Sequence, residues 1–146
     1  MNDEETLTFN ERNIAEFRAS HGRIASFGQA PLLLLTTVGA KSGQQRTSPM
    51  MYLQDDDDAN HVYVFASAAG ADRNPAWFHN LMANASIDVE IGDDHHRAIA
   101  EALTEPRRTE IYATQADRYP GFAGYQEMTT RVIPVIALTL EALGGN

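Results

Sequence analysis

Apolar residues recur along the chain in short runs that polar, glycine-containing segments separate. Within 61–67, Val62 and Val64 alternate with Tyr63 and Phe65, which predicts a strand with the two valines on one face and the two aromatic residues on the other. The run 32–38 is joined to the run 47–53 by a polar segment, which predicts a β-hairpin with a long loop. The runs together predict six strands, at 32–38, 47–53, 61–67, 86–91, 95–104 and 135–140.

Helical spacing appears in four other regions. Ile14, Phe17 and Ile24 predict a first helix over about 9–21. A second helix should begin at Pro75, with Asn74 as its cap, and should turn its apolar residues towards the core. The remaining helices are expected at 106–118 and 125–131. The segments 1–7 and 141–146 are expected to be frayed ends.

Strands joined by hairpins, with a helix before them, one between them and others late in the chain, indicate an α+β fold with mostly antiparallel pairing. Six strands around one core suggest a small barrel or a split barrel. At 146 residues, the whole chain 1–146 is expected to form a single domain.

Composition excludes several classes of function. The chain has no cysteine, so thiolate catalysis and cysteine metal sites are excluded. Its net charge of −9 repels phosphate backbones and argues against nucleic-acid binding. No apolar stretch could span a bilayer and no signal pattern is present, which predicts a cytoplasmic protein. Membrane-surface contact through the helix at 9–21 is a weaker alternative, since its polar face is mixed in charge. The oligomeric state is left open.

Candidate chemistry gathers in the hairpin loop. Lys41 is the only lysine in the chain, and Arg46 follows where the second strand should begin. Gly39 and Gly43 allow backbone N–H groups to turn to one side, and Ser42 adds a hydroxyl. Such a group of donors and cations can bind an anion. The alternative is an ordinary glycine-rich turn, and the pattern is not that of a nucleoside-triphosphate P-loop.

Metal binding is not expected. The aspartates Asp55 to Asp58 lack the glycine and distal glutamate of a calcium loop, so they predict a solvated hairpin tip. His95 and His96 are adjacent on an expected strand and would point to opposite faces. The prediction is therefore that the chain has no metal site.

Two later segments also contain candidate residues. Small residues at 67–71 lead into the helix at Pro75 and could approach a planar ligand, or could be a plain strand–helix connection. Tyr119, Phe122 and Tyr125 recur at a spacing of three and could line a mobile wall, or could fill the core beneath a joint between helices.

Several motifs in one order resemble a known family. They are Thr-Thr-x-Gly-x-Lys-Ser-Gly-x-x-Arg-x-x-Pro at 36–49, Ala-Ser at 66–67, Asn-Pro-Ala-Trp-Phe-His-Asn-Leu at 74–81, and Arg-x-Ile-Pro-Val at 131–135. Tyr119-Pro120 and Tyr125 complete the set. Over about residues 30–140 the chain resembles the deazaflavin-dependent nitroreductase family, which also contains deazaflavin-dependent quinone reductases.

This resemblance implies a split β-barrel like that of FMN-binding reductases, an actinobacterial source and coenzyme F-420 as the cofactor. It also implies that Tyr119 and Tyr125 line the substrate side as catalytic residues. The implied cofactor-binding residues are Lys41, Ser42 and Arg46 for the phosphate and acidic tail, Ser67, Ala68 and Ala69 for the ring, and Pro49, Asn74, Trp77 and Asn80 around them.

Two positions depart from the family pattern. The family often has Ser-Lys-Gly-Gly where this chain has Ser67-Ala68-Ala69-Gly70, which removes one cation. Phe122 stands where nitroreductase members carry a third tyrosine, and the lost hydroxyl argues against reduction of bulky nitroimidazoles.

The function that follows is hydride transfer from C5 of the reduced deazaflavin to an electron-poor small molecule. Quinones, nitroaromatics and activated alkenes are the expected acceptors. Two alternatives stay open: a non-catalytic protein that stores the deazaflavin, and an FMN-dependent oxidoreductase of similar barrel.

Overall fold

The computed structural model describes residues 3–141, so parts of both expected frayed ends, 1–2 and 142–146, lie outside the described residues. The helices are α1 (Asp3–Ala19), α2 (Ala76–Ala83), α3 (Arg107–Arg118) and α4 (Gly121–Glu127), with short 3-10 helices η1 (Ala25–Phe27) and η2 (Ala68–Gly70). The strands are β1 (Leu32–Val38), β2 (Gln45–Met51), β3 (Leu53–Gln54), β4 (His61–Phe65), β5 (Ser86–Ile91), β6 (Asp94–Ala102) and β7 (Val135–Leu140).

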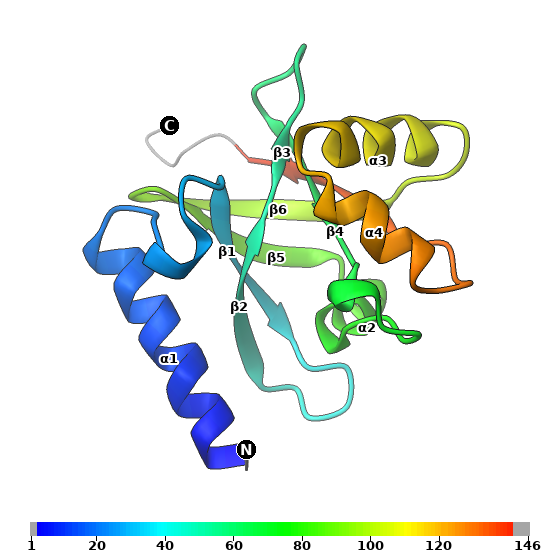
Figure 1. The fold of residues 1–146 in the computed structure, drawn as a ribbon. Helices are drawn as coiled ribbons and strands as arrows, with labels where there is room; N and C mark the ends of the chain where they lie inside the picture. The colour runs from blue at the N-terminus through cyan, green and yellow to red at the C-terminus, as the bar shows by residue number, and fades with distance from the viewer. Residues whose placement is uncertain (1–2, 142–146) are drawn as a thin grey trace.

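All of these strands form one antiparallel sheet in the order β2-β1-β5-β6-β7-β4-β3. The strands at its two ends, β2 and β3, are separated in the chain by Tyr52 alone. The sheet therefore curls until its two edges approach each other, and it forms the half-barrel that the helices surround in Figure 1. The expected α+β class and antiparallel pairing are confirmed.

The expected strand count of six is wrong, because the described residues form seven strands. The run predicted as one strand at 47–53 divides at Tyr52. β2 pairs with β1 as far as Met51, opposite Leu32, whereas β3 pairs with β4 through Leu53, opposite Tyr63. A run of apolar residues carries no signal for a change of partner, because the run shows only that side chains pack and does not show which strand lies beside them.

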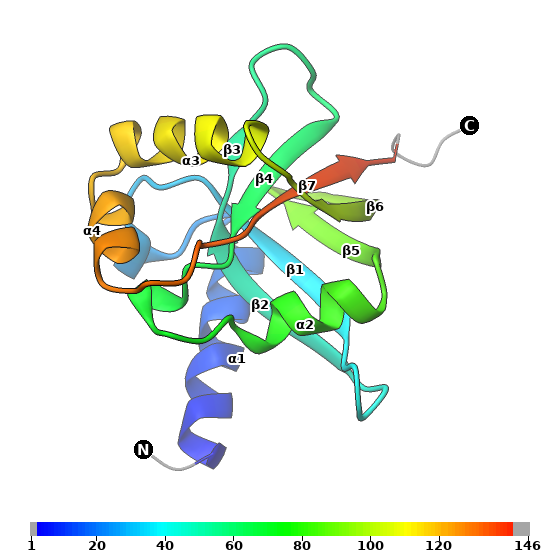
Figure 2. The same ribbon diagram turned by 90° about the vertical axis from the view of Figure 1, so that its right-hand side faces the viewer.

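The interior of the curled sheet holds the largest core. Val62 and Val64 of β4 point into it together with Leu33 and Leu35 of β1. Leu81 of α2 is fully buried in the same cluster. Figure 2 shows α2 lying along one end of the sheet, so this helix closes the interior there.

Parts of the outer face of the sheet are also covered. Tyr63 and Phe65 pack beneath α3 and α4, on the face of β4 opposite Val62 and Val64, and the alternation along β4 predicted these opposite faces. On the other side of the barrel, Phe17 of α1 packs against Leu32 and Leu34 of β1. Over β5 and β6 the outer face stays polar, with the exposed ion pair of Arg97 and Asp88.

Several helix boundaries differ from expectation. α1 begins at Asp3, so part of the segment expected to fray is helical. α4 begins at Gly121 instead of Tyr125. Asn74 does not cap α2, because its side chain accepts a hydrogen bond from Arg131. Within residues 3–141, no helix is both long and apolar enough to cross a bilayer.

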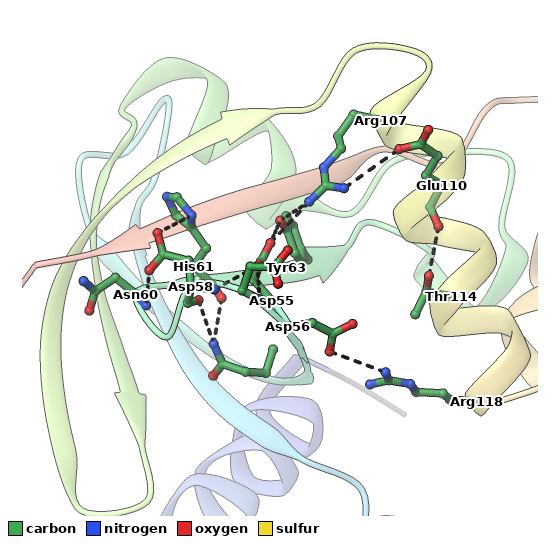
Figure 3. Close-up of polar contacts among 12 residues, drawn as sticks. Asp55, Asp56, Asp58, Asn60, His61, Tyr63, Arg107, Glu110, Thr114 and Arg118 are labelled. Carbon is green, nitrogen blue, oxygen red and sulfur yellow. Dashed lines mark hydrogen bonds and ion pairs between the residues drawn. The ribbon is translucent and has the colours of Figure 1, made fainter.

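The aspartate-rich hairpin tip is tied to α3 through Asp55, whose side chain is only 11% exposed (Figure 3). Its carboxylate accepts hydrogen bonds from the hydroxyl of Tyr63, from Arg107 at 3.2 Å, and from the backbone N–H groups of Asp57 and Asp58. The side chain of Asp55 therefore stabilises the turn. The expectation of a solvated hairpin tip fits the neighbours of Asp55 better than Asp55 itself.

The Asp55→Asn variant should lose about 1–3 kcal/mol of stability at neutral pH, because an amide nitrogen would face the donors of Tyr63 and Arg107. The hydrogen bond from Tyr63, with those from the backbone, holds the pKa of Asp55 below its ordinary value. Wild type should therefore keep this stability above about pH 4 and lose it as the pH falls through the lowered folded pKa.

Urea unfolding between neutral and acid pH measures this effect. The matched control is Asp57→Asn, which changes an exposed aspartate in the same turn. Equal unfolding midpoints for the two variants at neutral pH would contradict the role given to Asp55.

Candidate functional site

A cleft of about 870 Å³ lies where the β1–β2 loop meets the first turns of α2. The β1–β2 loop supplies one wall and α2 supplies the other. The described residues that line it are Asn10, Gly39, Ala40, Lys41, Ser42, Arg46, Thr47, Ser48, Ala76, Trp77, His79 and Asn80.

The charge of this cleft is opposite to that of the chain. Lys41 and Arg46 line it, and none of the described lining residues is an aspartate or glutamate. Both cations are exposed, and neither pairs with a carboxylate of residues 10–141. In a chain with a net charge of −9, this is a local positive field that suits an anionic ligand.

The loop that carries the cations has an ordered backbone. Gly39 N donates to Gln44 O at 2.7 Å, and Gly43 N donates back to Gly39 O at 3.0 Å. A Cβ atom at Gly39 would lie 2.5 Å from the Oγ of Ser42, so any larger residue would displace this hydroxyl. The same Oγ accepts from Gln44 N at 3.1 Å. It can still donate its own hydrogen, because a hydroxyl both accepts and donates.

Asn80 joins the two walls of the cleft. Its Oδ1 accepts from Ala40 N at 3.0 Å, and its Nδ2 donates to the Oγ1 of Thr37 at 3.1 Å. Asn80 is 8% exposed and Thr37 is 1% exposed, so the bond between their side chains is shielded from water. Asn80 thus acts on the site by holding α2 against the β1–β2 hairpin.

Trp77 gives the cleft its apolar wall. Its side chain packs partly on the interior core and partly lines the cleft, together with Ala76. A planar aromatic side chain beside two cations suits a ligand with a flat ring and an acidic tail.

The small residues predicted to meet a ring lie in η2, outside the cleft lining. Ala68 and Ala69 both adopt left-handed backbone conformations, with φ of 45° and 54°. This short helix packs against α4 and leads through Asn74 into α2. Ser67 to Ala69 therefore border the start of α2, and the structure does not bring their side chains together with Lys41 and Arg46.

The two candidate tyrosines lie with the α3–α4 cluster and do not line the cleft. Both are half-buried, and neither hydroxyl has a hydrogen-bond partner within the described residues. Phe122 between them is 9% exposed and packs edge-on against Phe65 and Tyr125. Pro49 is a half-buried residue of β2 opposite Leu34 and does not line the cleft either.

Sequence reasoning assigned no role to three residues that the structure places at or next to the site. Asn10 and His79 line the cleft, and Arg131 binds the loop that precedes α2. Asn10 carried no local signal, because α1 reaches the cleft only through the fold. His79 and Arg131 stand inside the motifs at 74–81 and 131–135, where their presence alone says nothing about contacts.

Comparison with known proteins shows the family. A family profile described as F420H(2)-dependent quinone reductase matches residues 10–140. The chain belongs to this family. A quinone reductase of Mycobacterium tuberculosis, described in the same words, is 34% identical over 134 residues, with 86% of this chain and 85% of that protein covered. The resemblance drawn from the motifs is confirmed, and coenzyme F-420 is the cofactor in the family's description.

Solved structures of similar proteins show the same fold. A F420-H2 dependent reductase is 33% identical and superposes with a TM-score of 0.66, covering 74% of this chain and 93% of that chain. Another structure, described as a domain-swapped dimer, is 28% identical with a TM-score of 0.68 and covers 94% and 99% of the two chains.

Asn80→Ala should destabilise this family member by about 1–3 kcal/mol, because Thr37 and the N–H of Ala40 lose their buried partner. Urea unfolding gives the free energy directly. Met82→Ala is the control on the same helix, since the Met82 side chain is exposed. A loss for Asn80→Ala no larger than that for Met82→Ala would show that Asn80 does not hold α2 in place.

Proposed function

We propose that this chain is an oxidoreductase that passes a hydride from reduced coenzyme F-420 to a quinone. One observation carries the proposal: in a strongly acidic chain, Lys41 and Arg46 line a cleft whose described walls contain no carboxylate. An acidic cofactor can bind such a chain only where the local field overcomes the global one. Membership of the family supports the identity of that cofactor.

The cleft residues fit the anionic half of the coenzyme, which is a phosphate with a polyglutamate tail. Lys41 would act as a point charge, and the guanidinium of Arg46 would offer a planar pair of donors. Ser42 keeps a hydroxyl hydrogen for an acceptor oxygen while its Oγ braces the loop. These three residues would hold the phosphate and the first carboxylates.

The region proposed for the deazaflavin ring is flatter and less polar than the region proposed for the tail. Trp77 would form one wall, and the small side chains of Ala68 and Ala69 would allow a ring to approach the backbone of η2. The bound coenzyme supplies the hydride, and the protein supplies position and electrostatics. The reacting atoms must come within about 3–3.5 Å of each other, so the walls must be held rigidly.

Tyr119 and Tyr125 would serve the acceptor side. Reduction of a quinone builds negative charge on oxygen, and a positioned hydroxyl can donate a hydrogen bond or a proton to it. The support is that both hydroxyls lack partners within the described residues and that α4, which carries Tyr125, packs on η2.

Phe122 favours quinones over bulky nitroimidazoles as acceptors. Its ring is buried among Phe65, Tyr112 and Tyr125. The position therefore contributes packing and offers no hydroxyl to an acceptor.

Lys41→Ala should raise the Kd for oxidised coenzyme F-420 about ten- to a hundredfold, because a charge-assisted contact is lost. Fluorescence titration of the coenzyme measures it. Arg73→Ala is the matched control, since Arg73 is an exposed cation that does not line the cleft. Equal affinities for Lys41→Ala and wild type would show that the coenzyme does not bind in this cleft as proposed.

The same preparation separates the alternatives. Preferred binding of FMN would replace the deazaflavin proposal by an FMN-dependent one. If reduced coenzyme binds but menadione does not oxidise it over many turnovers faster than without protein, the chain is a storage protein and the proposed activity is wrong.

Tyr119→Phe and Tyr125→Phe should lower kcat/KM for menadione, by roughly a hundredfold for whichever tyrosine donates the proton. The Kd for the coenzyme should stay close to that of wild type. Tyr52→Phe, which lies outside the α3–α4 cluster, is the control. Unchanged kcat/KM in both tyrosine variants would show that water supplies the proton.

A further inference from the structure

We propose that Arg131 is a positioning residue for the cofactor ring, because it sets the loop 66–74 in one conformation relative to both α2 and α4. The inference rests on the proposed function, since it concerns the ring of the same coenzyme. It goes further by assigning the ring and the tail to different residues, with Arg131 acting on the ring alone.

The guanidinium of Arg131 donates hydrogen bonds to both ends of the loop. Its Nε donates to Ala71 O at 2.8 Å and its Nη2 to Ser67 O at 2.8 Å. Its Nη1 donates to Ala66 O at 3.1 Å and to the Oδ1 of Asn74 at 2.8 Å. One planar group thus binds both the start and the end of a segment of nine residues, 66–74.

All four acceptors of Arg131 are neutral. By contrast, Arg18 faces the carboxylate of Glu90 and Arg97 faces that of Asp88. Four acceptors around one plane match the fixed fork of a guanidinium, which the ammonium of a lysine does not reproduce. The geometry is therefore specific to arginine, and its effect is to hold the loop in one conformation.

The loop needs such restraint, because its backbone is unfavourable by itself. Ala68 and Ala69 are both left-handed, which costs L residues energy that their surroundings must offset. Gly70 follows with a φ of 84°, and a Cβ atom there would lie 3.0 Å from Met128. The loop is thus strained and pressed against the segment after α4.

Arg131 is itself anchored from behind. Its backbone carbonyl accepts from Nε2 of Gln126 at 2.7 Å, and the Oε1 of Gln126 accepts from Arg108 at 2.9 Å. Gln126 belongs to α4 and Arg108 to α3. These hydrogen bonds therefore fix the position of the loop relative to α3 and α4. Helix α4 carries Tyr125, and α3 ends next to Tyr119.

The other end of the linkage reaches the cleft. Asn74, which Arg131 holds, stands directly before Pro75 and the first turn of α2. That turn carries Ala76 and Trp77 of the cleft lining. Arg131 therefore lies at the joint between the acceptor-side helix and the ring wall, whereas Lys41 and Arg46 lie on the opposite wall.

Two ligands separate these roles. The intact oxidised coenzyme F-420 has both ring and tail, and 8-hydroxy-5-deazariboflavin has the ring without phosphate or glutamates. Arg131→Gln should raise the Kd for both ligands by the same factor, roughly tenfold for hydrogen bonds of this kind. Lys41→Ala should raise the Kd for the intact coenzyme and leave that for the tail-less ring unchanged.

Three results would overturn or replace the inference. A folded Arg131→Gln protein that binds both ligands as wild type does would show that the role is structural only. Loss of affinity for the intact coenzyme alone would make Arg131 a second tail-binding cation. If wild type binds neither ligand, the proposed function fails, and that failure is visible with wild type alone.

Milder variants keep the test valid if Arg131→Gln does not fold. Asn74→Ala removes one of the four acceptors, and Arg131→Lys keeps the charge without the fork. Both should weaken binding of the tail-less ring and speed hydrogen exchange of the amides in 66–74, with Asn74→Ala the closer to wild type because it keeps three of the four contacts. Arg97→Gln is the control arginine, and unchanged ring affinity and exchange in both variants would refute the role.

Discussion

Burial of the inner face of one curled sheet is the constraint on which the arrangement of this protein depends. That face is filled by alternate residues such as Val62 and Leu35, while α1 covers the outer face at β1 and α3 and α4 cover it at β4. An interior filled by apolar side chains has no room for a charged ligand. The cleft forms instead at the end of the barrel, where the β1–β2 loop meets α2.

At that end, a few polar contacts decide the geometry. Asn80 bonds α2 to the hairpin that carries Lys41 and Arg46, and Arg131 bonds the loop before α2 to the region of α4. Each contact joins segments that are far apart in the chain. Each therefore fixes the distance between two of the segments that border the cleft. The cations themselves make no such contacts with carboxylates of residues 10–141, which leaves their charge for a ligand.

Local sequence patterns predicted the features of the fold that depend on neighbouring residues alone. Alternation along β4 assigned Val62 and Tyr63 to opposite faces. The cations of the β1–β2 loop line one cleft, while their binding of an anion stays a prediction. The change of partner at Tyr52 was missed, because it depends on how far the whole sheet curls. The capping role expected of Asn74 was wrong for a similar reason, since Arg131, distant in sequence, uses that side chain.

The direct test of the account is a crystal structure of the protein with oxidised coenzyme F-420. We expect phosphate oxygens within about 2.7–2.9 Å of the Lys41 ammonium and the Arg46 guanidinium, as charge-assisted hydrogen bonds require. The ring should then lie between Trp77 and the η2 loop. A coenzyme bound elsewhere on the chain, with neither cation in contact, would contradict the assignment of this cleft.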